Sequence, residues 1–250
     1  MTSKKSKRHF PNRPLLSQSD RHPKIVKSAK RELPIVHAIL HLAPAELSGY
    51  NVCPMASEGC KAACLHTSGH HNPRKYAARL WKTQMFFEAR GDFIRRLHKE
   101  LKSLSVKAKR QNAIACVRLN GTSDIPWETV HWDVSTWDNE YETYNNVMEA
   151  FPDIHFYDYT KRHNRKNLPS NYRLTFSRSE DNNKQCGEAL DNGMNVAVVF
   201  RDKLPWRWKG LPVIDGDEHD YRFNDPHPCI VGLRAKGKGK HDTSGFVVDV

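Results

Sequence analysis

Three cysteines lie close together in the stretch Val52–His71, which reads VCPMASEGCKAACLHTSGHH. They are Cys53, Cys60 and Cys64, in a C-x6-C-x3-C spacing. Pro54 and Gly59 predict a loop there rather than one continuous helix or strand. Thiolates are soft, charged ligands, and three on one loop can hold a zinc ion or three corners of an iron–sulfur cluster. We therefore expect a metal site at this loop, with the fold built around it.

The spacing bears on which metal binds. Zinc fingers usually show two paired knuckles of the form C-x2-4-C or H-x3-5-H, and the three cysteines, in their C-x6-C-x3-C spacing, do not form two such pairs. Three thiolates with an open fourth position favour a [4Fe–4S] cluster. His66 or His70 could instead complete a Cys3His zinc site, so zinc is the alternative. The dispersed Cys116, Cys186 and Cys229 are more simply explained as small buried apolar residues.

Apolar segments alternate with helical segments along the chain. Strands are expected at 34–43, 113–119, 154–159, 172–176, 195–200, 213–214, 229–233 and 246–250, and helices at 73–89, 92–104, 140–151 and 182–191. Several strands are apolar enough to be buried on both faces, which is typical of parallel sheets. The predicted fold is therefore α/β, with a mostly parallel sheet or a partial (β/α) barrel and the cysteine loop after the first strand.

Polar residues gather just after the predicted strands. The ligand-binding candidates at these positions are Asn120, Asp124, Lys161, Arg178 and Arg201. Ligands of open α/β sheets bind at the carboxyl ends of the strands. The cysteine loop also follows a strand, so we expect it to share one cleft with these side chains. The cations would hold a small anionic ligand such as a phosphate or carboxylate, although each could be an ordinary surface base. No catalytic residue can be assigned.

Charge is concentrated at the start of the chain. The 250-residue sequence has a net charge of +12, and residues 1–31 contain ten lysines and arginines against one acid, Asp20. We interpret 1–31 as a flexible basic arm preceding a single α/β domain at 32–250. Such an arm attracts phosphates, so nucleic acid is the partner it suggests. No apolar run is long enough to cross a membrane, and we expect a soluble, cytoplasmic protein without a membrane partner.

Two late stretches carry opposite charge. The run 214–220, IDGDEHD, offers hard oxygen ligands for a divalent cation, although a solvated acidic turn is the more ordinary interpretation. The stretch 233–241, LRAKGKGKH, is basic and rich in glycine, so its backbone could approach a phosphate or a cofactor carboxylate closely.

The combination of motifs resembles a family of phage-encoded proteins of unknown function. The resemblance rests on a strand, a CP…GC…C loop, a helix, a strand ending in RLNGTSD and a late LRAKG segment, from about residue 34 to the C-terminus. More distantly, a three-cysteine loop after the first strand resembles the radical S-adenosylmethionine enzymes. That resemblance implies a [4Fe–4S] cluster whose fourth iron binds S-adenosylmethionine. The usual C-x3-C-x2-C spacing and a Gly-Gly-Glu after the second strand are missing, so the spacing does not support S-adenosylmethionine binding.

Three functions are compatible with these features. The first is a phage-encoded iron–sulfur enzyme, working in the host cytoplasm on an anionic or nucleic-acid-related ligand. The second is a nucleic-acid-binding accessory protein, and the third is a modulator of a host protein, both with a purely structural cluster or zinc. An enzyme predicts a pocket beside an open metal position, whereas a structural metal predicts a closed four-ligand site. A modulator predicts an exposed patch and no pocket.

Overall fold

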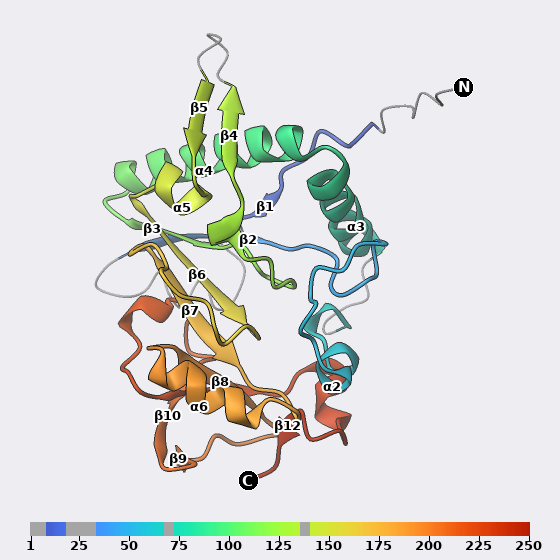
Figure 1. Cartoon of the computed structure of the whole chain (residues 1–250), viewed down its shortest axis with the longest axis vertical. Coiled ribbons are helices and arrows are strands. Elements are labelled where there is room, and N and C mark those ends of the chain that lie inside the picture. Colours follow the sequence, from blue (N-terminus) through green and yellow to red (C-terminus); the bar gives the residue numbers. More distant parts are fainter. Residues whose placement is uncertain (1–8, 19–33, 68–72, 136–140) are drawn as a thin grey trace.

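A ten-stranded sheet forms the centre of the computed structural model, which describes residues 9–18, 34–67, 73–135 and 141–250 (Figure 1). In spatial order its strands are β1 (Leu16–Ser17), β2 (Ile35–Leu40), β3 (Ile114–Arg118), β6 (Ile154–Thr160), β7 (Tyr172–Ser177), β8 (Asn195–Phe200), β11 (Ile230–Arg234), β10 (Leu211–Asp215) and β9 (Arg207–Trp208), while β12 (Val247–Val248) pairs with β8. In this spatial order, the strands from β2 to β10 all run parallel to one another. Strands β1 and β9 pair antiparallel to their neighbours at the two edges. The predicted α/β class with a mostly parallel sheet is confirmed, and the sheet does not close into a barrel.

Helices connect the parallel strands. They are α2 (Glu58–Ala62), α3 (Pro73–Glu88), α4 (Arg90–Arg110), α5 (Val147–Ala150) and α6 (Asn183–Asp191), and a separate hairpin comprises β4 (Trp132–Ser135) and β5 (Tyr141–Tyr144). Figure 1 shows α4 in the upper half of the molecule and α6 in the lower half. From β2 to β8, strands of the main sheet that follow one another along the chain also lie next to one another in the sheet. None of the described helices is long and apolar enough to cross a membrane.

The main core lies between the sheet and its helices. Alternate residues of β2, among them Ala38 and Leu40, are fully buried there. Helix α4 contributes Phe93, Leu97 and Leu101, which recur every four residues and are also fully buried. Burying one such side chain stabilises the fold by about 1.5–3 kcal/mol. The spacing of Phe93, Leu97 and Leu101, which in the sequence predicts one apolar helix face, is therefore the spacing that packs α4 on the sheet.

Two local predictions in this region are wrong. In the sequence, Gly91 predicts the break between the two helices and Asp92 predicts the cap of the second. The break between α3 and α4 falls instead at Ala89, whose φ of −140° interrupts the helix, and Asp92 lies inside the first turn of α4. The helix predicted at 140–151 is instead strand β5 followed by the short helix α5. The β5 residues pair with β4, and Asn146 caps α5 by accepting hydrogen bonds from the next turn, so the helix starts only at Val147.

The described residues near the N-terminus pack against the domain. Leu15 and Leu16 are buried, and their backbone N–H groups each donate to the Glu100 carboxylate at 2.8 Å. Lys82 Nζ donates to the Leu15 carbonyl at 2.5 Å, and burial lowers the pKa of Lys82 to about 8 despite the opposing attraction of Glu100. The predicted arm at 1–31 therefore does not extend through residues 14–17. Residues 1–8 and 19–33, which carry nine of its ten cations, lie outside the described residues.

Candidate metal centre

The three loop cysteines line one cavity of about 590 Å³. Cys53, Cys60 and Cys64 are partly buried, and none forms a disulfide. The opposite wall comes from the carboxyl ends of β3 and β6, from the loop after β3 and from the C-terminal segment around β12. The loop thus faces the edge of the sheet at which parallel α/β folds bind ligands.

Helix α2 fixes the second cysteine. Ser57 caps this helix, and its Oγ accepts a hydrogen bond from Cys60 N at 3.2 Å. Glu180, which follows β7, accepts from Ser57 Oγ at 2.9 Å and from Gly59 N at 2.8 Å. A Cβ on Gly59 would lie 2.2 Å from Ser244 Oγ, so glycine permits the close approach of α2 to the C-terminal segment. Figure 1 shows α2 beside that segment.

The loop after β3, residues 120–124, is tied to the first cysteine. Asp124 N donates to the Val52 carbonyl at 2.8 Å, and the Cys53 thiol contacts the Thr122 carbonyl at 3.8 Å. Gly121 is needed here because a Cβ would lie 2.7 Å from the Leu40 carbonyl. The polar loop and the cysteine loop therefore form one connected wall.

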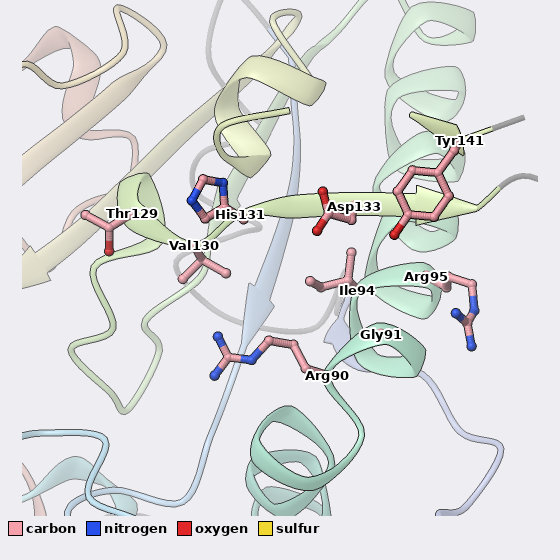
Figure 2. A pocket seen from close by; sticks show the side chains of 9 residues that line it. All are labelled: Arg90, Gly91, Ile94, Arg95, Thr129, Val130, His131, Asp133 and Tyr141. Carbon is pink, nitrogen blue, oxygen red and sulfur yellow. The ribbon is translucent and has the colours of Figure 1, made fainter. Parts of the chain in front are cut away.

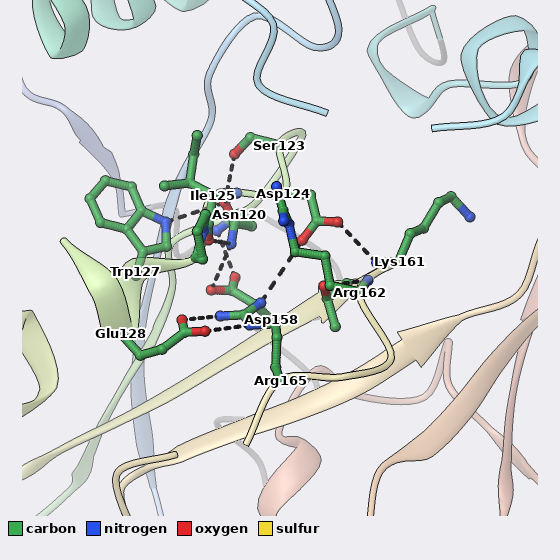
Figure 3. Close-up of polar contacts among 12 residues, drawn as sticks. Asn120, Ser123, Asp124, Ile125, Trp127, Glu128, Asp158, Lys161, Arg162 and Arg165 are labelled. Atoms are coloured by element: carbon green, nitrogen blue, oxygen red, sulfur yellow. Dashed lines mark hydrogen bonds and ion pairs between the residues drawn. The ribbon is translucent and has the colours of Figure 1, made fainter. Parts of the chain in front are cut away.

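Asn120 holds this polar loop in place (Figure 3). Its Oδ1 accepts from Ile125 N at 2.9 Å and from Trp127 Nε1 at 3.2 Å, and its Nδ2 donates to the Ile125 carbonyl at 2.9 Å. Asp158 accepts from Asn120 N at 2.6 Å and from Tyr172 Oη at 2.9 Å. Burial raises the pKa of Asp158 to about 7, although the Asn120 hydrogen bond opposes this. Asn120 lines the cavity, but its amide positions the loop.

Asp124 and Lys161 also line the cavity. Asp124 Oδ2 accepts from Lys161 N at 2.9 Å. The Lys161 ammonium donates to the carbonyls of Ser177 and Arg178 at 3.1 and 3.3 Å. Its positive charge is therefore held in place by neutral acceptors, and no carboxylate of a described residue forms an ion pair with it.

The thiols are electrostatically coupled. Burial raises the pKa of Cys53 to about 12, and burial raises the pKa of both Cys60 and Cys64. A charge on Cys64 raises the pKa of the other two further, while Lys161 lowers that of Cys60 and Arg79 lowers that of Cys64. Three thiolates are thus unfavourable here without added positive charge. A metal supplies that charge and deprotonates its thiol ligands outright.

The donor side chains are not gathered around one point. Among the described residues, no three His, Cys, Asp or Glu side chains form a group that could hold a metal ion. His66 also lines the cavity, whereas His70 lies outside the described residues.

The acidic run at 214–220 forms ion pairs. Asp215 pairs with Arg234 at 2.9 Å, and Asp217 pairs with Lys236 at 2.6 Å. These pairs neutralise both carboxylates and join the predicted acidic and basic stretches, of which Asp217, Arg234 and Lys236 line the cavity.

Two of the predicted ligand-binding candidates do not line the cavity. Arg178 donates to the Phe246 carbonyl at 3.0 Å, and Arg201 donates to the carbonyls of Lys240 and Asp242 at 2.8 and 2.9 Å. Both arginines anchor the C-terminal segment. The physical reason is that β12 pairs with the last residues of β8 and so occupies the edge where these arginines were expected to bind a ligand.

Arg118 and Tyr159 line the cavity but were missed in the sequence. The Arg118 guanidinium lies over the Tyr159 ring at 4.6 Å, and the Tyr159 hydroxyl is buried without a hydrogen-bond partner among the described residues. Arg118 is the last residue of β3 and Tyr159 is the next to last of β6, and Tyr159 packs with Ile114 and Cys116 on the sheet face opposite the α4 core. Successive side chains of a strand point to opposite faces of the sheet, and applying this alternation to the second face of β3 and β6 could have identified both residues.

A smaller cavity of about 330 Å³ lies between the start of α4 and the β4–β5 hairpin (Figure 2). Its polar side chains include Arg90, His131 and Asp133, all of which are exposed. No cysteine lines it, so it lacks the thiol donors of the cysteine cavity.

Comparison with known proteins places the chain in a family. The model of the family described as gene product 88 matches residues 14–250. No curated protein and no solved structure gives a significant match. The matched region begins just before β1 and includes all the described strands, the cysteine loop and the C-terminal segment. The chain belongs to the gene product 88 family.

Proposed function

We propose that this protein is a phage-encoded iron–sulfur enzyme whose [4Fe–4S] cluster is held by Cys53, Cys60 and Cys64. The observation that supports this most is that all three thiols line one cavity at the carboxyl edge of a parallel sheet. Iron–sulfur clusters are held by cysteine thiolates, and three cysteines leave one iron for another ligand.

The residues around the cavity define what a ligand would meet. A volume of about 590 Å³ lies within the range of small-molecule sites. Arg118 and Lys161 bring positive charge to the wall, which suits an anionic or nucleic-acid-related ligand. A bound cluster would supply electron transfer and an iron open to an incoming ligand. The chain itself orients the ligand and shields it from water.

Anaerobic purification tests this proposal. We expect brown protein with about four iron and four sulfide ions per chain and the broad visible absorption of a cluster that bleaches on reduction. Colourless protein with about one zinc ion per chain would instead indicate a structural zinc site. Protein that binds neither metal, even after anaerobic reconstitution, would reject the metal site.

A second candidate function is nucleic-acid binding with a structural metal. The net charge of +12 favours it, as does the solvent face of α4, where the exposed cations include Arg95, Lys99, Lys102, Lys109 and Arg110. Clustered lysines and arginines attract phosphates in a salt-dependent, sequence-independent way. In this function the cavity would not need to bind a small ligand.

A further inference from the structure

Arg118 brings a cation to the cysteine cavity whose terminal nitrogens have no partner among the described residues. The residue ends β3, and its Nε donates to the Asn120 carbonyl at 3.2 Å. Its guanidinium lies over the Tyr159 ring, with Cζ 4.6 Å from the ring centroid. Asp158 and Asp220 attract this charge, but no described carboxylate forms an ion pair with it. The guanidinium is thus held in place, while Nη1 and Nη2 are left for a ligand.

The other cations that line this cavity are already engaged at their terminal nitrogens. Lys161 Nζ donates to two carbonyls and one hydroxyl, at 3.1, 3.3 and 3.4 Å. Lys61 pairs with Glu58 at 2.8 Å. Arg234 and Lys236 pair with aspartates at 2.9 and 2.6 Å. Among the cations of the described cavity wall, Arg118 is therefore the one that still offers both of its terminal nitrogens.

The rest of the wall indicates what kind of anion would fit. Its apolar side chains include those of Leu47, Leu65, Val199, Leu233 and Phe246. A charged hydrogen bond is stronger in such surroundings than in water. A guanidinium matches a planar carboxylate, which it binds through two parallel N–H···O bonds. A phosphate dianion would bring a second negative charge for which the described wall has no other free cation. An apolar molecule with one carboxylate therefore fits the wall best.

We infer that Arg118 is the residue of this cavity that binds the ligand's charged group, and that the ligand is an organic acid with a carboxylate on an apolar body. Nη1 and Nη2 donate to the two carboxylate oxygens, and the Tyr159 ring keeps the guanidinium in position. Lys161 holds the ends of β6 and β7 together and does not bind the carboxylate. The inference rests on the proposed function in taking this cavity as a ligand site, but it requires no bound metal.

The test measures how three probes bind to the full-length protein, by line broadening in fluorine NMR spectra. The probes are para-fluorobenzoate, its neutral planar analogue para-fluorobenzamide, and para-fluorophenyl phosphate. They are titrated into the wild type, Arg118→Gln, Arg118→Lys and the matched control Lys61→Gln. The control also removes one positive charge from the cavity wall, but from a side chain that is already paired with Glu58. Circular dichroism establishes that each variant is folded.

We expect the wild type to bind the benzoate more tightly than the amide or the phosphate. Arg118→Gln should weaken benzoate binding about 10- to 100-fold, which corresponds to the loss of charged hydrogen bonds, and should leave amide binding unchanged. Lys61→Gln should bind as the wild type does. If Arg118→Gln does not fold, Arg118→Lys decides the matter, because lysine keeps the charge but loses the two-pronged geometry and should still weaken benzoate binding.

Four results would overturn the inference. They are a wild type that binds no benzoate at millimolar concentration, equal binding of benzoate and amide, tighter binding of the phosphate, and equal weakening by the Arg118 and Lys61 variants. Iron and sulfide are assayed in the same samples. A protein that binds benzoate through Arg118 but no iron, even after anaerobic reconstitution, would reject the iron–sulfur proposal and leave this inference standing. A protein with a complete cluster and no benzoate binding would do the reverse.

Discussion

Buried polar residues position the candidate site more than they contribute chemistry to it. Asn120 uses its whole amide to hold the polar loop, and Asp158 supports Asn120 from the neighbouring strand. Both are almost completely buried. A buried polar network with satisfied partners makes one conformation specific, which is what a metal-binding wall requires.

The pH dependence of stability should reveal Asp158. Because its pKa in the folded protein is about 7 against an ordinary 3.8, the folded state holds a proton that the unfolded state has lost between these values. The free energy of unfolding should therefore fall as pH rises from about 4 to about 7, with a slope approaching about 1.4 kcal/mol per pH unit from this group. Urea denaturation across this range measures it. Asp158→Asn should lack this component, and an unchanged slope would contradict the assignment.

Some site residues could be read from the sequence and others could not. The three cysteines, Asn120, Asp124 and Lys161 all line the cavity, as their positions after strands predicted. Arg178 and Arg201 follow strands too, but a strand from the distant C-terminus covers their edge. Local position reveals which edge a residue lies on. It does not reveal which other segment competes for that edge.

Helix α2 is too short to be stable by itself. It has five residues and depends on capping by Ser57 and on the Glu180 carboxylate, which comes from the segment after β7. Isolated helices of this length do not form in water, because helix nucleation is unfavourable. The position of Cys60 therefore depends on a tertiary contact.

Replacing Glu180 by alanine should loosen the cysteine loop. The change removes hydrogen bonds from Ser57 and Gly59 to a charged acceptor, and we expect a loss of about 1.5–3 kcal/mol in the free energy of unfolding. Bound metal should also dissociate faster, as followed by chelator competition. Glu188→Ala on α6 is the control, since its half-exposed carboxylate pairs with His163 and the exposed Lys184, away from the cysteine loop. Equal metal retention in the two variants would argue against this role.

Element prediction succeeded where the pattern was local. The strand 195–200 matches β8, and the four-residue recurrence on α4 matches its buried face. The segment 140–151 failed because its aromatic and threonine residues pair across the hairpin with β4, Trp132 opposite Tyr144. Such cross-strand pairs stabilise a strand only when the partner is present, and a helical pattern cannot show that partner.

At the scale of the whole molecule, one sheet joins the two ends of the described chain. Strand β1 pairs with β2 at one edge, and β12 from the C-terminus pairs with β8. The sequence predicted a mostly parallel sheet because several strands are apolar throughout, but it did not show that residues 14–17 return to the sheet. That return depends on long-range contacts with α3 and α4.

The basic N-terminal residues should control nucleic-acid affinity if the second candidate function holds. Replacing Lys4, Lys5, Lys7 and Arg8 by glutamine avoids the packed residues at 14–17. We expect weaker binding to double-stranded DNA and a slope of log affinity against log salt reduced by up to about 0.9 per lost phosphate contact. The control replaces the exposed Lys184, Lys203, Lys238 and Lys240 on the folded domain. A fall in the salt slope in the control alone would place the phosphate contacts on the domain.

The most direct test of the metal site is the metal content of single cysteine variants. Cys53→Ala, Cys60→Ala and Cys64→Ala should each lose most bound iron and sulfide, because each thiol holds a separate corner of the cluster. Cys116→Ala and Cys186→Ala remove buried thiols that do not line the cavity, and they should retain the wild-type content. Full metal content in all three loop variants would contradict the site, whatever the activity of the protein.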